Sequence, residues 1–159
     1  MKIRIGLGYD VHALKAGEEL WLGGIKIEHE LGCIAHSDGD VVLHAICDAM
    51  LGALALGDIG LHFPDTSDDY KGIDSKILLK RVYKLINKND YTLGNMDVVI
   101  SMQRPKLRPH IDIMRQCIAE TLEVDINDIS IKATTTEWLG FEGREEGVSC
   151  QASVLLVKN

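Results

Sequence analysis

Residues 3–12 alternate between apolar side chains and glycine or polar residues, and this period of two is typical of a β-strand with one apolar face. The apolar side chains occupy positions 3, 5, 7 and 9. Asp10 and His12 belong to the opposite set, so we expect a carboxylate and an imidazole on one face near the end of this strand. The pattern predicts a sheet strand that carries two potential metal ligands.

A helix is expected over residues 39–56, because a cluster of capping residues at 37–40 precedes a nearly all-apolar segment. Its polar residues Asp40, His44 and Asp48 are spaced four apart and form one stripe along an otherwise buried helix. Polar groups in such a position need partners. Asp48 lies one turn beyond His44, where a carboxylate either orients that imidazole or stays at the exposed surface.

Asp10, His12 and His44 together form a donor set of two imidazoles and one carboxylate. This set suits Zn²⁺, and three protein ligands leave one tetrahedral position for water or substrate. Taken alone, the same pattern also fits a histidine that is hydrogen-bonded in the core beside a polar strand end. A catalytic metal site is therefore one of two interpretations of these residues.

Length and composition limit the class of protein. With 159 residues and 46% hydrophobic content, we expect one domain over residues 1–159 with a substantial core. The four cysteines are widely spaced and form no CxxC pair, which indicates a reducing compartment and a cytoplasmic location. We expect no targeting segment and no membrane span. A net charge of −7 argues against nucleic-acid binding and permits a small anionic ligand only where metal ions or local cations offset the repulsion.

The rest of the chain alternates strands and helices. The expected elements are a hairpin over 20–27, a helix from 74 to about 88, a strand over 96–102, a helix after Pro109, and strands over 128–135 and 147–157. Residues 57–73 lack periodicity, and we expect a long loop that is either a binding loop or a solvated acidic connection. These elements predict an α+β fold: a two-layer α/β sandwich with a mixed or antiparallel sheet and helices on one face. The other face of the sheet would then be covered by a subunit partner.

The segment from Ala133 to Glu137 follows a predicted strand and contains three threonines and a carboxylate. Hydroxyls and a carboxylate at a strand end can bind phosphate oxygens and a hard cation such as Mg²⁺. Threonine runs are also ordinary in strands and turns, so the segment alone does not decide between these interpretations.

Several short motifs occur along the chain in a fixed order: Asp10-Val11-His12, His36-Ser37-Asp38-Gly39-Asp40, Asp58-Ile59-Gly60, Phe63-Pro64-Asp65-Thr66, Arg104-Pro105-Lys106, and Ala133-Thr134-Thr135-Thr136-Glu137 with Phe141 and Arg144. In this order and spacing they resemble the 2-C-methyl-D-erythritol 2,4-cyclodiphosphate synthase family. The resemblance runs from the first predicted strand to the last, and the combination is far more specific than any one motif.

The resemblance implies a metal-dependent phosphorus–oxygen lyase of the non-mevalonate isoprenoid route. Such an enzyme cyclises 4-diphosphocytidyl-2-C-methyl-D-erythritol 2-phosphate and releases CMP. Family members are homotrimers with their sheets packed around the three-fold axis and with active sites between subunits. No protein nucleophile is needed, because the 2-phosphate of the substrate attacks its own β-phosphorus.

The resemblance also assigns roles to residues of this sequence. Zn²⁺ would be bound by Asp10, His12 and His44, and a second divalent cation, Mg²⁺ or Mn²⁺, by Glu137. His36 and Thr135 would stabilise the transition state, and Ser37 would contact a substrate phosphate. Asp58, Gly60, Phe63, Pro64 and Asp65 would surround the ribose and erythritol groups. The pocket for the cytidine diphosphate, contributed by the neighbouring subunit, would include Met102, Pro105, Lys106, Leu107, Arg108, Ala133, Thr134 and Thr136.

Three positions depart from the family pattern. Met102 stands where a small residue is common, and Arg108 where a hydrophobic residue is usual. Tyr9 replaces a frequent phenylalanine and, with Phe141 and Arg144, would line an apolar cavity on the trimer axis where family members hold isoprenoid diphosphates. Two other functions fit the metal-site residues: a zinc-dependent phosphohydrolase, and a non-catalytic trimer that binds nucleotide or isoprenoid diphosphate.

Overall fold

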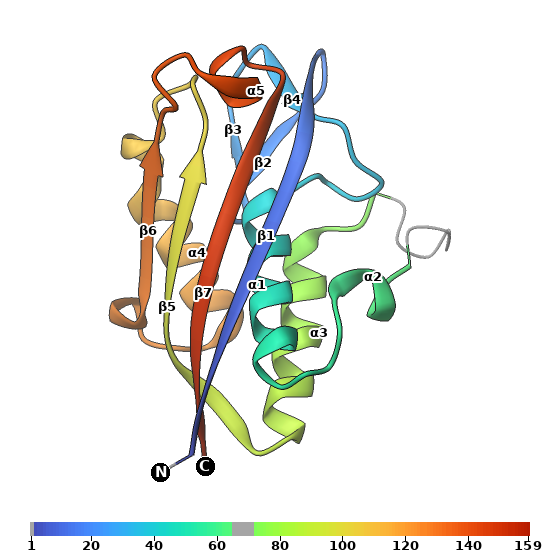
Figure 1. Cartoon of the computed structure of the whole chain (residues 1–159), viewed down its shortest axis with the longest axis vertical. Coiled ribbons are helices and arrows are strands. Elements are labelled where there is room, and N and C mark those ends of the chain that lie inside the picture. The colour runs from blue at the N-terminus through green and yellow to red at the C-terminus, as the bar shows by residue number, and fades with distance from the viewer. Residues whose placement is uncertain (1, 65–71) are drawn as a thin grey trace.

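The computed structural model describes residues 2–64 and 72–159. Within them, five strands form one mixed sheet in the order β4-β1-β7-β5-β6 (Figure 1). These strands are β1 (Ile3–Ala16), β4 (Leu31–Cys33), β5 (Tyr91–Ser101), β6 (Ile129–Thr134) and β7 (Gly147–Lys158). The long strands β1 and β7 pair antiparallel, as do β5 and β7, whereas β5 and β6 are parallel. The mixed sheet confirms the predicted sheet type.

Three long helices lie on one face of this sheet (Figure 1). They are α1 (Val41–Ala53), α3 (Ser75–Lys88) and α4 (Ile111–Leu122). The strands β2 (Leu20–Leu22) and β3 (Ile25–Ile27) form the predicted hairpin as a separate two-stranded sheet. Short helical turns are α2 (Ile59–His62), η2 (Arg108–His110), η3 (Ile126–Asp128) and α5 (Gly140–Gly143). The α+β class with helices on one face is therefore confirmed.

Helix α1 lies unusually close to strand β1. A Cβ atom built on Gly6 would lie 1.8 Å from the carbonyl oxygen of Ala49, and one on Gly8 would lie 1.9 Å from that of Ala45. Only glycine permits this approach, because any side chain at either position would overlap the helix backbone. The contact brings His44 of α1 beside Asp10, which lies near the middle of β1.

The opposite face of β1 is apolar and exposed in the single chain. Ile5 is 73% exposed and Leu7 is 69% exposed. The neighbouring outward residues Ile3, Tyr9 and Val11 are exposed as well. An apolar row of this size at the surface is typical of a face that contacts another molecule.

Element boundaries differ from the predictions at several places. Strand β1 continues to Ala16, β5 begins at Tyr91, and the short strand β4 has no counterpart among the predicted elements. The expectation that residues 57–73 lack regular structure is wrong for residues 59–62, which form α2. This turn is stabilised because the Asp58 carboxylate accepts a hydrogen bond from the Leu61 N–H at 2.8 Å. Residues 65–71 of that segment lie outside the described residues.

Among the described residues, none of the helices combines the length and the apolar character that crossing a membrane requires.

Candidate metal centre and active site

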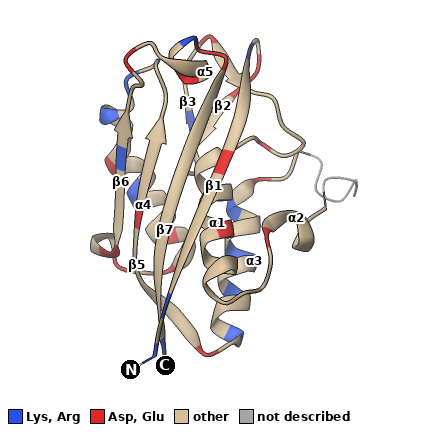
Figure 2. Ribbon diagram, in the orientation of Figure 1, with Lys and Arg blue, Asp and Glu red and all other residues tan. Residues whose placement is uncertain are grey.

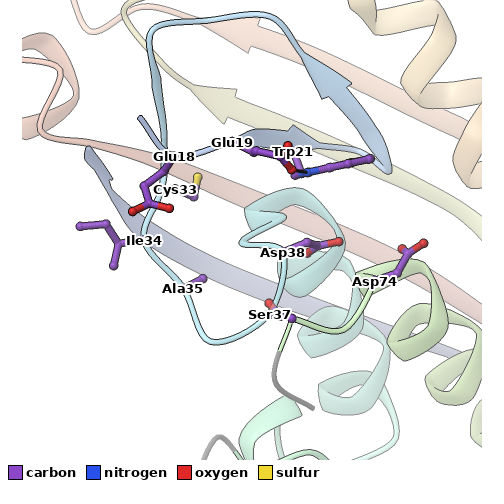
Figure 3. A pocket seen from close by; sticks show the side chains of 10 residues that line it. Glu18, Glu19, Trp21, Cys33, Ile34, Ala35, Ser37, Asp38 and Asp74 are labelled. Atoms are coloured by element: carbon purple, nitrogen blue, oxygen red, sulfur yellow. Dashed lines mark hydrogen bonds between the residues drawn. The ribbon is translucent and has the colours of Figure 1, made fainter. Parts of the chain in front are cut away.

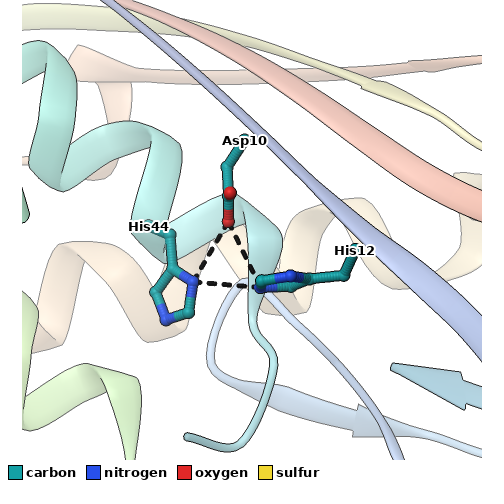
Figure 4. Close-up of side chains that lie close together, drawn as sticks. All are labelled: Asp10, His12 and His44. Atoms are coloured by element: carbon teal, nitrogen blue, oxygen red, sulfur yellow. Dashed lines mark hydrogen bonds and ion pairs between the residues drawn. The ribbon is translucent and has the colours of Figure 1, made fainter. Parts of the chain in front are cut away.

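Asp10, His12 and His44 converge on one point between β1 and α1 (Figure 4). Asp10 Oδ2 lies 3.1 Å from His44 Nδ1 and 3.3 Å from His12 Nε2. The two ring nitrogens, His12 Nε2 and His44 Nδ1, are 3.2 Å apart. The strand contributes two of these groups from alternate positions, and the helix contributes the third.

This triangle has the dimensions of a metal-ligand set. Ligands arranged tetrahedrally around zinc at bond lengths of about 2.0–2.1 Å lie roughly 3.3 Å from one another. The three distances between the donor atoms are 3.1, 3.2 and 3.3 Å. Two imidazoles and a carboxylate are also the ligand types that zinc accepts in sites with an open position. The residues present therefore fit a divalent metal ion.

The two imidazoles have different electrostatic surroundings. Burial lowers the pKa of His12, and the nearby Asp10 carboxylate only partly offsets this effect. Burial also acts to lower the pKa of His44, but hydrogen bonding to Asp10 and the negative charges of Asp10, Asp40 and Asp38 outweigh it. The pKa of His44 is consequently raised above its ordinary value.

His44 is supported from its far side by two serines. Its Nε2 lies 2.9 Å from Ser75 Oγ and 3.3 Å from Ser37 Oγ. The sequence predicts that Asp48 either orients this imidazole or stays at the exposed surface, and the structure supports neither of these two roles. Its half-buried carboxylate instead accepts the backbone N–H of Ile59 at 2.7 Å. Asp48 thus fixes the start of α2 next to the site.

Asp40, the first residue of the predicted polar stripe, is a buried structural carboxylate. It accepts hydrogen bonds from the backbone N–H groups of Gly23, Gly24, Val42 and Leu43 at 2.6–3.1 Å. These bonds cap α1 and tie its start to the β2–β3 hairpin. The orientation of α1, and with it the position of His44, depends on this residue.

A cavity of about 350 Å³ opens beside the metal-ligand triangle. It is lined by Asp10, His12, Ala35, His36, Ser37, His44, Ile59, Gly60, Phe63, Ile73 and Leu78. The predicted residues His36, Ser37, Gly60 and Phe63 are therefore brought together with the three metal ligands. This cavity can hold a small ligand in contact with both the triangle and the Ser37 hydroxyl.

A second cavity, of about 440 Å³, lies between the ends of β5 and β6 and the start of α4. Its lining contains most of the residues predicted for a nucleotide pocket: Met102, Pro105, Lys106, Leu107, Arg108, Ala133 and Thr134. Thr135, predicted to stabilise the transition state, lines it as well. Met102 and Leu107 are buried in its wall. This cavity and the one beside the metal-ligand triangle share no lining residue, so they are two separate cavities of the chain.

Thr135 and Glu137 stand at the end of β6 in a tight turn. Glu137 has a left-handed backbone with φ of 52°, and its Oε1 accepts a hydrogen bond from Thr135 Oγ1 at 3.0 Å. Within the described part of the chain, Glu137 does not belong to the group formed by Asp10, His12 and His44. The predicted second metal ligand is therefore separate from the first site in the same chain.

The other predicted site residues lie outside the linings of these two cavities. Asp58 caps α2, and Pro64 follows that turn at the surface. Thr136 Oγ1 donates to the carbonyl oxygen of Leu139 at 2.5 Å, and Arg144 forms a two-pronged ion pair with Glu146. Phe141 lies against Gly147, and Asp65 lies outside the described residues.

A third cavity, of about 470 Å³, adjoins the cavity beside the metal-ligand triangle and shares Ala35 and Ser37 with it (Figure 3). Glu18, Glu19, Asp38 and Asp74 give its lining an acidic character. Carboxylates without a bound cation repel phosphate groups, so this cavity is unsuited to an anionic substrate.

Sequence reasoning missed the roles of Ser75 and of the Gly6 and Gly8 pair. The glycines could have been recognised from the sequence, since glycine at alternate positions of a strand indicates that another backbone packs closely there. Ser75 had none, because it resembles an ordinary residue at a helix start.

An α+β fold that presents an Asp/His/His group to a small cavity defines a candidate metalloenzyme. A family model described as the YgbB family matches residues 3–157, and the chain belongs to this family. A relative from Parabacteroides distasonis is 61% identical over 156 residues, which are 98% of this chain and 97% of that protein. A second relative, from Bacteroides thetaiotaomicron, is 57% identical over 159 residues and covers 100% of both chains. Both are named 2-C-methyl-D-erythritol 2,4-cyclodiphosphate synthase.

Solved structures agree with this assignment. The bifunctional IspDF from Campylobacter jejuni is 43% identical with a TM-score of 0.96, and the match covers 99% of this chain and 43% of that chain. This chain thus spans less than half of that bifunctional protein. A CDP complex of IspF from Plasmodium falciparum is 38% identical with a TM-score of 0.88, and the match covers 99% of this chain and 97% of that chain.

Proposed function

We propose that this protein is a 2-C-methyl-D-erythritol 2,4-cyclodiphosphate synthase of isoprenoid biosynthesis. It would convert 4-diphosphocytidyl-2-C-methyl-D-erythritol 2-phosphate into the cyclic diphosphate and CMP, as a phosphorus–oxygen lyase. The observation that carries the proposal is the Asp10/His12/His44 triangle at a cavity with His36 and Ser37, in a chain 57–61% identical to named synthases. A phosphohydrolase or a purely binding protein has no comparable support.

The reaction requires positioning rather than a protein nucleophile. An oxygen of the 2-phosphate forms a bond to the β-phosphorus, and the bond from that phosphorus to the bridging oxygen of CMP breaks. In our proposal the Ser37 hydroxyl donates a hydrogen bond to a substrate phosphate, and His36 and Thr135 stabilise charge on the equatorial oxygens. Asp58, Gly60 and the segment of Phe63, Pro64 and Asp65 hold the sugar groups. Folding the two ends of one substrate together supplies the proximity that the attack needs.

Two divalent cations would complete the site. We propose Zn²⁺ on Asp10, His12 and His44, and Mg²⁺ or Mn²⁺ held with the help of Glu137. When bound, these ions neutralise phosphate charge in a protein whose net charge is −7. The dimensions of the triangle and the exposed position of Glu137 in its turn support this division of ligands.

The nucleotide would occupy the second cavity. Our proposed pocket for the cytidine diphosphate consists of lining residues of this cavity, together with Thr136, which follows the lining residue Thr135 in the chain: Met102, Pro105, Lys106, Leu107, Arg108, Ala133, Thr134 and Thr136. Lys106 supplies a positive charge there, and the apolar walls fit a base. The CDP bound in the similar Plasmodium falciparum structure supports a ligand of this kind.

We further propose that the active site is shared between subunits of a homotrimer. Two observations support this assembly: the apolar, exposed face of β1, and the division of the site residues between two cavities of one chain. Three sheets packed around a common axis would bury the apolar face and bring the nucleotide cavity of one subunit to the metal centre of the next. An isoprenoid diphosphate on the axis, near Tyr9, Phe141 and Arg144, is part of the same proposal.

The four free cysteines, Cys33, Cys47, Cys117 and Cys150, support a reducing compartment, and we propose the cytoplasm.

Release of CMP tests the function. Protein loaded with Zn²⁺ and Mg²⁺ is incubated with the substrate, and CMP is measured by chromatography. We expect CMP from the wild type and a loss of at least about 100-fold for His44→Ala, because a metal ligand is removed. His62→Ala is the matched control, since His62 binds the Leu56 carbonyl and does not line the site cavity. Equal activity of His44→Ala and the wild type would refute the proposed centre.

A further inference from the structure

The imidazole of His44 is engaged on both sides. Figure 4 shows Nδ1 facing the Asp10 carboxylate. The distance from Nδ1 to Asp10 Oδ2 is 3.1 Å, and that from Nε2 to Ser75 Oγ is 2.9 Å. A neutral imidazole carries one proton, and the nitrogen without it is the metal ligand. A partner that accepts a proton from Nε2 therefore favours the form in which Nδ1 has a lone pair for a metal.

The hydroxyl proton of Ser75 is donated to another residue and is not available to His44. Ser75 Oγ donates to Asp38 Oδ1 at 2.5 Å, and an ionised carboxylate can only accept. Ser75 Oγ consequently presents its lone pairs to His44 Nε2. At a separation of 2.9 Å, this contact is favourable only when Nε2 carries a proton.

Asp38 is itself held in place. It accepts the backbone N–H of Ser75 at 2.8 Å and that of Asp40 at 3.1 Å. Ser75 is fully buried as the first residue of α3. The starts of α1 and α3 therefore fix the orientation of the Ser75 hydroxyl.

Ser37 does not compete for the same role. Its Oγ accepts the backbone N–H of Gly39 at 3.2 Å, and it lies 3.3 Å from His44 Nε2. It therefore acts as a second, longer acceptor for the Nε2 proton. Its own hydroxyl proton stays available for a phosphate oxygen.

We propose that Ser75, held by Asp38, is a positioning residue of the metal centre. When a metal is bound, the Ser75 oxygen accepts the Nε2 proton, holds the ring in place and leaves the Nδ1 lone pair for the metal. This inference rests on the proposed metal centre and adds to it the residue that orients the ligand His44. Outer partners of this kind typically change metal affinity by about 10–100-fold when removed.

The state of both ring nitrogens can be observed directly in the Zn²⁺-loaded wild type. Long-range ¹H–¹⁵N correlation NMR distinguishes a protonated ring nitrogen from one that binds a metal. We expect His44 to carry its proton on Nε2 and to bind the metal through Nδ1. Binding through Nε2 would overturn the proposal without bearing on whether the enzyme is a cyclase, and the experiment needs no variant that could misfold.

Metal affinity provides the second test. We expect Ser75→Ala to weaken Zn²⁺ binding by about 10–100-fold, measured by competition with a chromogenic chelator. The matched control is Asp74→Ala, which removes the cap of the same helix, where Asp74 Oδ1 accepts the Lys76 N–H at 2.8 Å. We expect Asp74→Ala to bind Zn²⁺ as tightly as the wild type.

Three results of this test would count against the inference. Unchanged affinity in Ser75→Ala would overturn it, and so would an equal loss in Asp74→Ala, which would attribute the effect to helix stability alone. A wild type that binds no Zn²⁺ would refute the metal centre and this inference with it. By contrast, weaker binding in Ser75→Ala with a fully active, Zn²⁺-binding wild type would support both.

Discussion

At the residue scale, the two histidines of the site should titrate on opposite sides of the ordinary imidazole value of 6.5. Burial holds the pKa of His12 below that value, whereas Asp10 and the other nearby carboxylates raise the pKa of His44 despite its burial. Protons compete with a metal for both rings, so affinity falls as the pH decreases. Because the pKa of His44 is raised, the fall should begin above pH 6.5.

Histidine NMR of the metal-free protein, followed against pH, checks this prediction, and Zn²⁺ affinity at the same pH values checks its consequence. In the metal-free protein, His44 contributes to the free energy of unfolding at low pH, because its pKa is raised in the folded state, and this contribution is lost as the pH rises through that pKa. His12 has a lowered pKa, so its effect on the free energy of unfolding has the opposite pH dependence. The opposite order of the two titrations would contradict the electrostatic description of the site.

Residue patterns were sufficient to find the candidate metal ligands but not the groups that support them. Asp10 and His12 follow from a strand period of two, and His44 follows from the polar stripe of an apolar helix. Ser75 is separated from His44 by 31 positions, and a serine at a helix start has no distinctive pattern. Hydrogen bonds between distant segments depend on packing, which the sequence does not reveal locally.

At the element scale, the packing of α1 on β1 places the site, and Gly8→Ala tests it. The added methyl group would meet the Ala45 carbonyl at 1.9 Å, so the helix must move. We expect a loss of about 3 kcal/mol or more in the free energy of unfolding, measured with urea, and weaker Zn²⁺ binding.

Gly52→Ala is the control, because Gly52 lies in α1 and the nearest atom to its added Cβ is 3.9 Å away. It should stabilise the protein by up to about 1 kcal/mol. Equal stability of Gly8→Ala and the wild type would contradict the close contact.

The long elements were predictable and the short ones were not. Strands β1 and β7 and helices α3 and α4 have clear apolar periods, and the structure confirms them. The short turns α2 and α5 contain four residues each, which is too few for a period to be detected. Helix α2 exists because Asp58 and Asp48 accept its first free N–H groups, and Asp48 reaches it only in the folded chain.

At the scale of the whole molecule, the exposed apolar face of β1 supports the proposed trimer. We expect light scattering to give a mass three times the 17.6 kDa of the chain. Leu7→Asp should dissociate this assembly and abolish activity, because a charge would be buried in the apolar interface. Ile113→Asp is the matched control, since Ile113 is an exposed apolar residue of α4, on the helical side of the sheet, at 57% exposure. A monomeric wild type with full activity would refute the shared site.

The sequence identified most of the candidate site, yet the geometry of one chain separates it into two cavities. Patterns place Thr135 and Glu137 at a strand end and His44 on a helix, but they contain no information on distances between elements. Only the folded chain shows that Glu137 does not join the Asp10/His12/His44 group within the described residues. The proposed assembly explains this separation in physical terms, because contacts between subunits are not encoded in local periodicity.

In the proposed reaction the protein cyclises its substrate without the use of water. Phosphorus-31 NMR of the products, after incubation with Zn²⁺, Mg²⁺ and 4-diphosphocytidyl-2-C-methyl-D-erythritol 2-phosphate, distinguishes this cyclisation from hydrolysis. We predict signals of CMP and of two mutually coupled phosphorus atoms in a cyclic diphosphate, both lost in His44→Ala. Inorganic phosphate in place of the coupled pair, or unchanged substrate with fully metal-loaded protein, would contradict the proposed cyclisation.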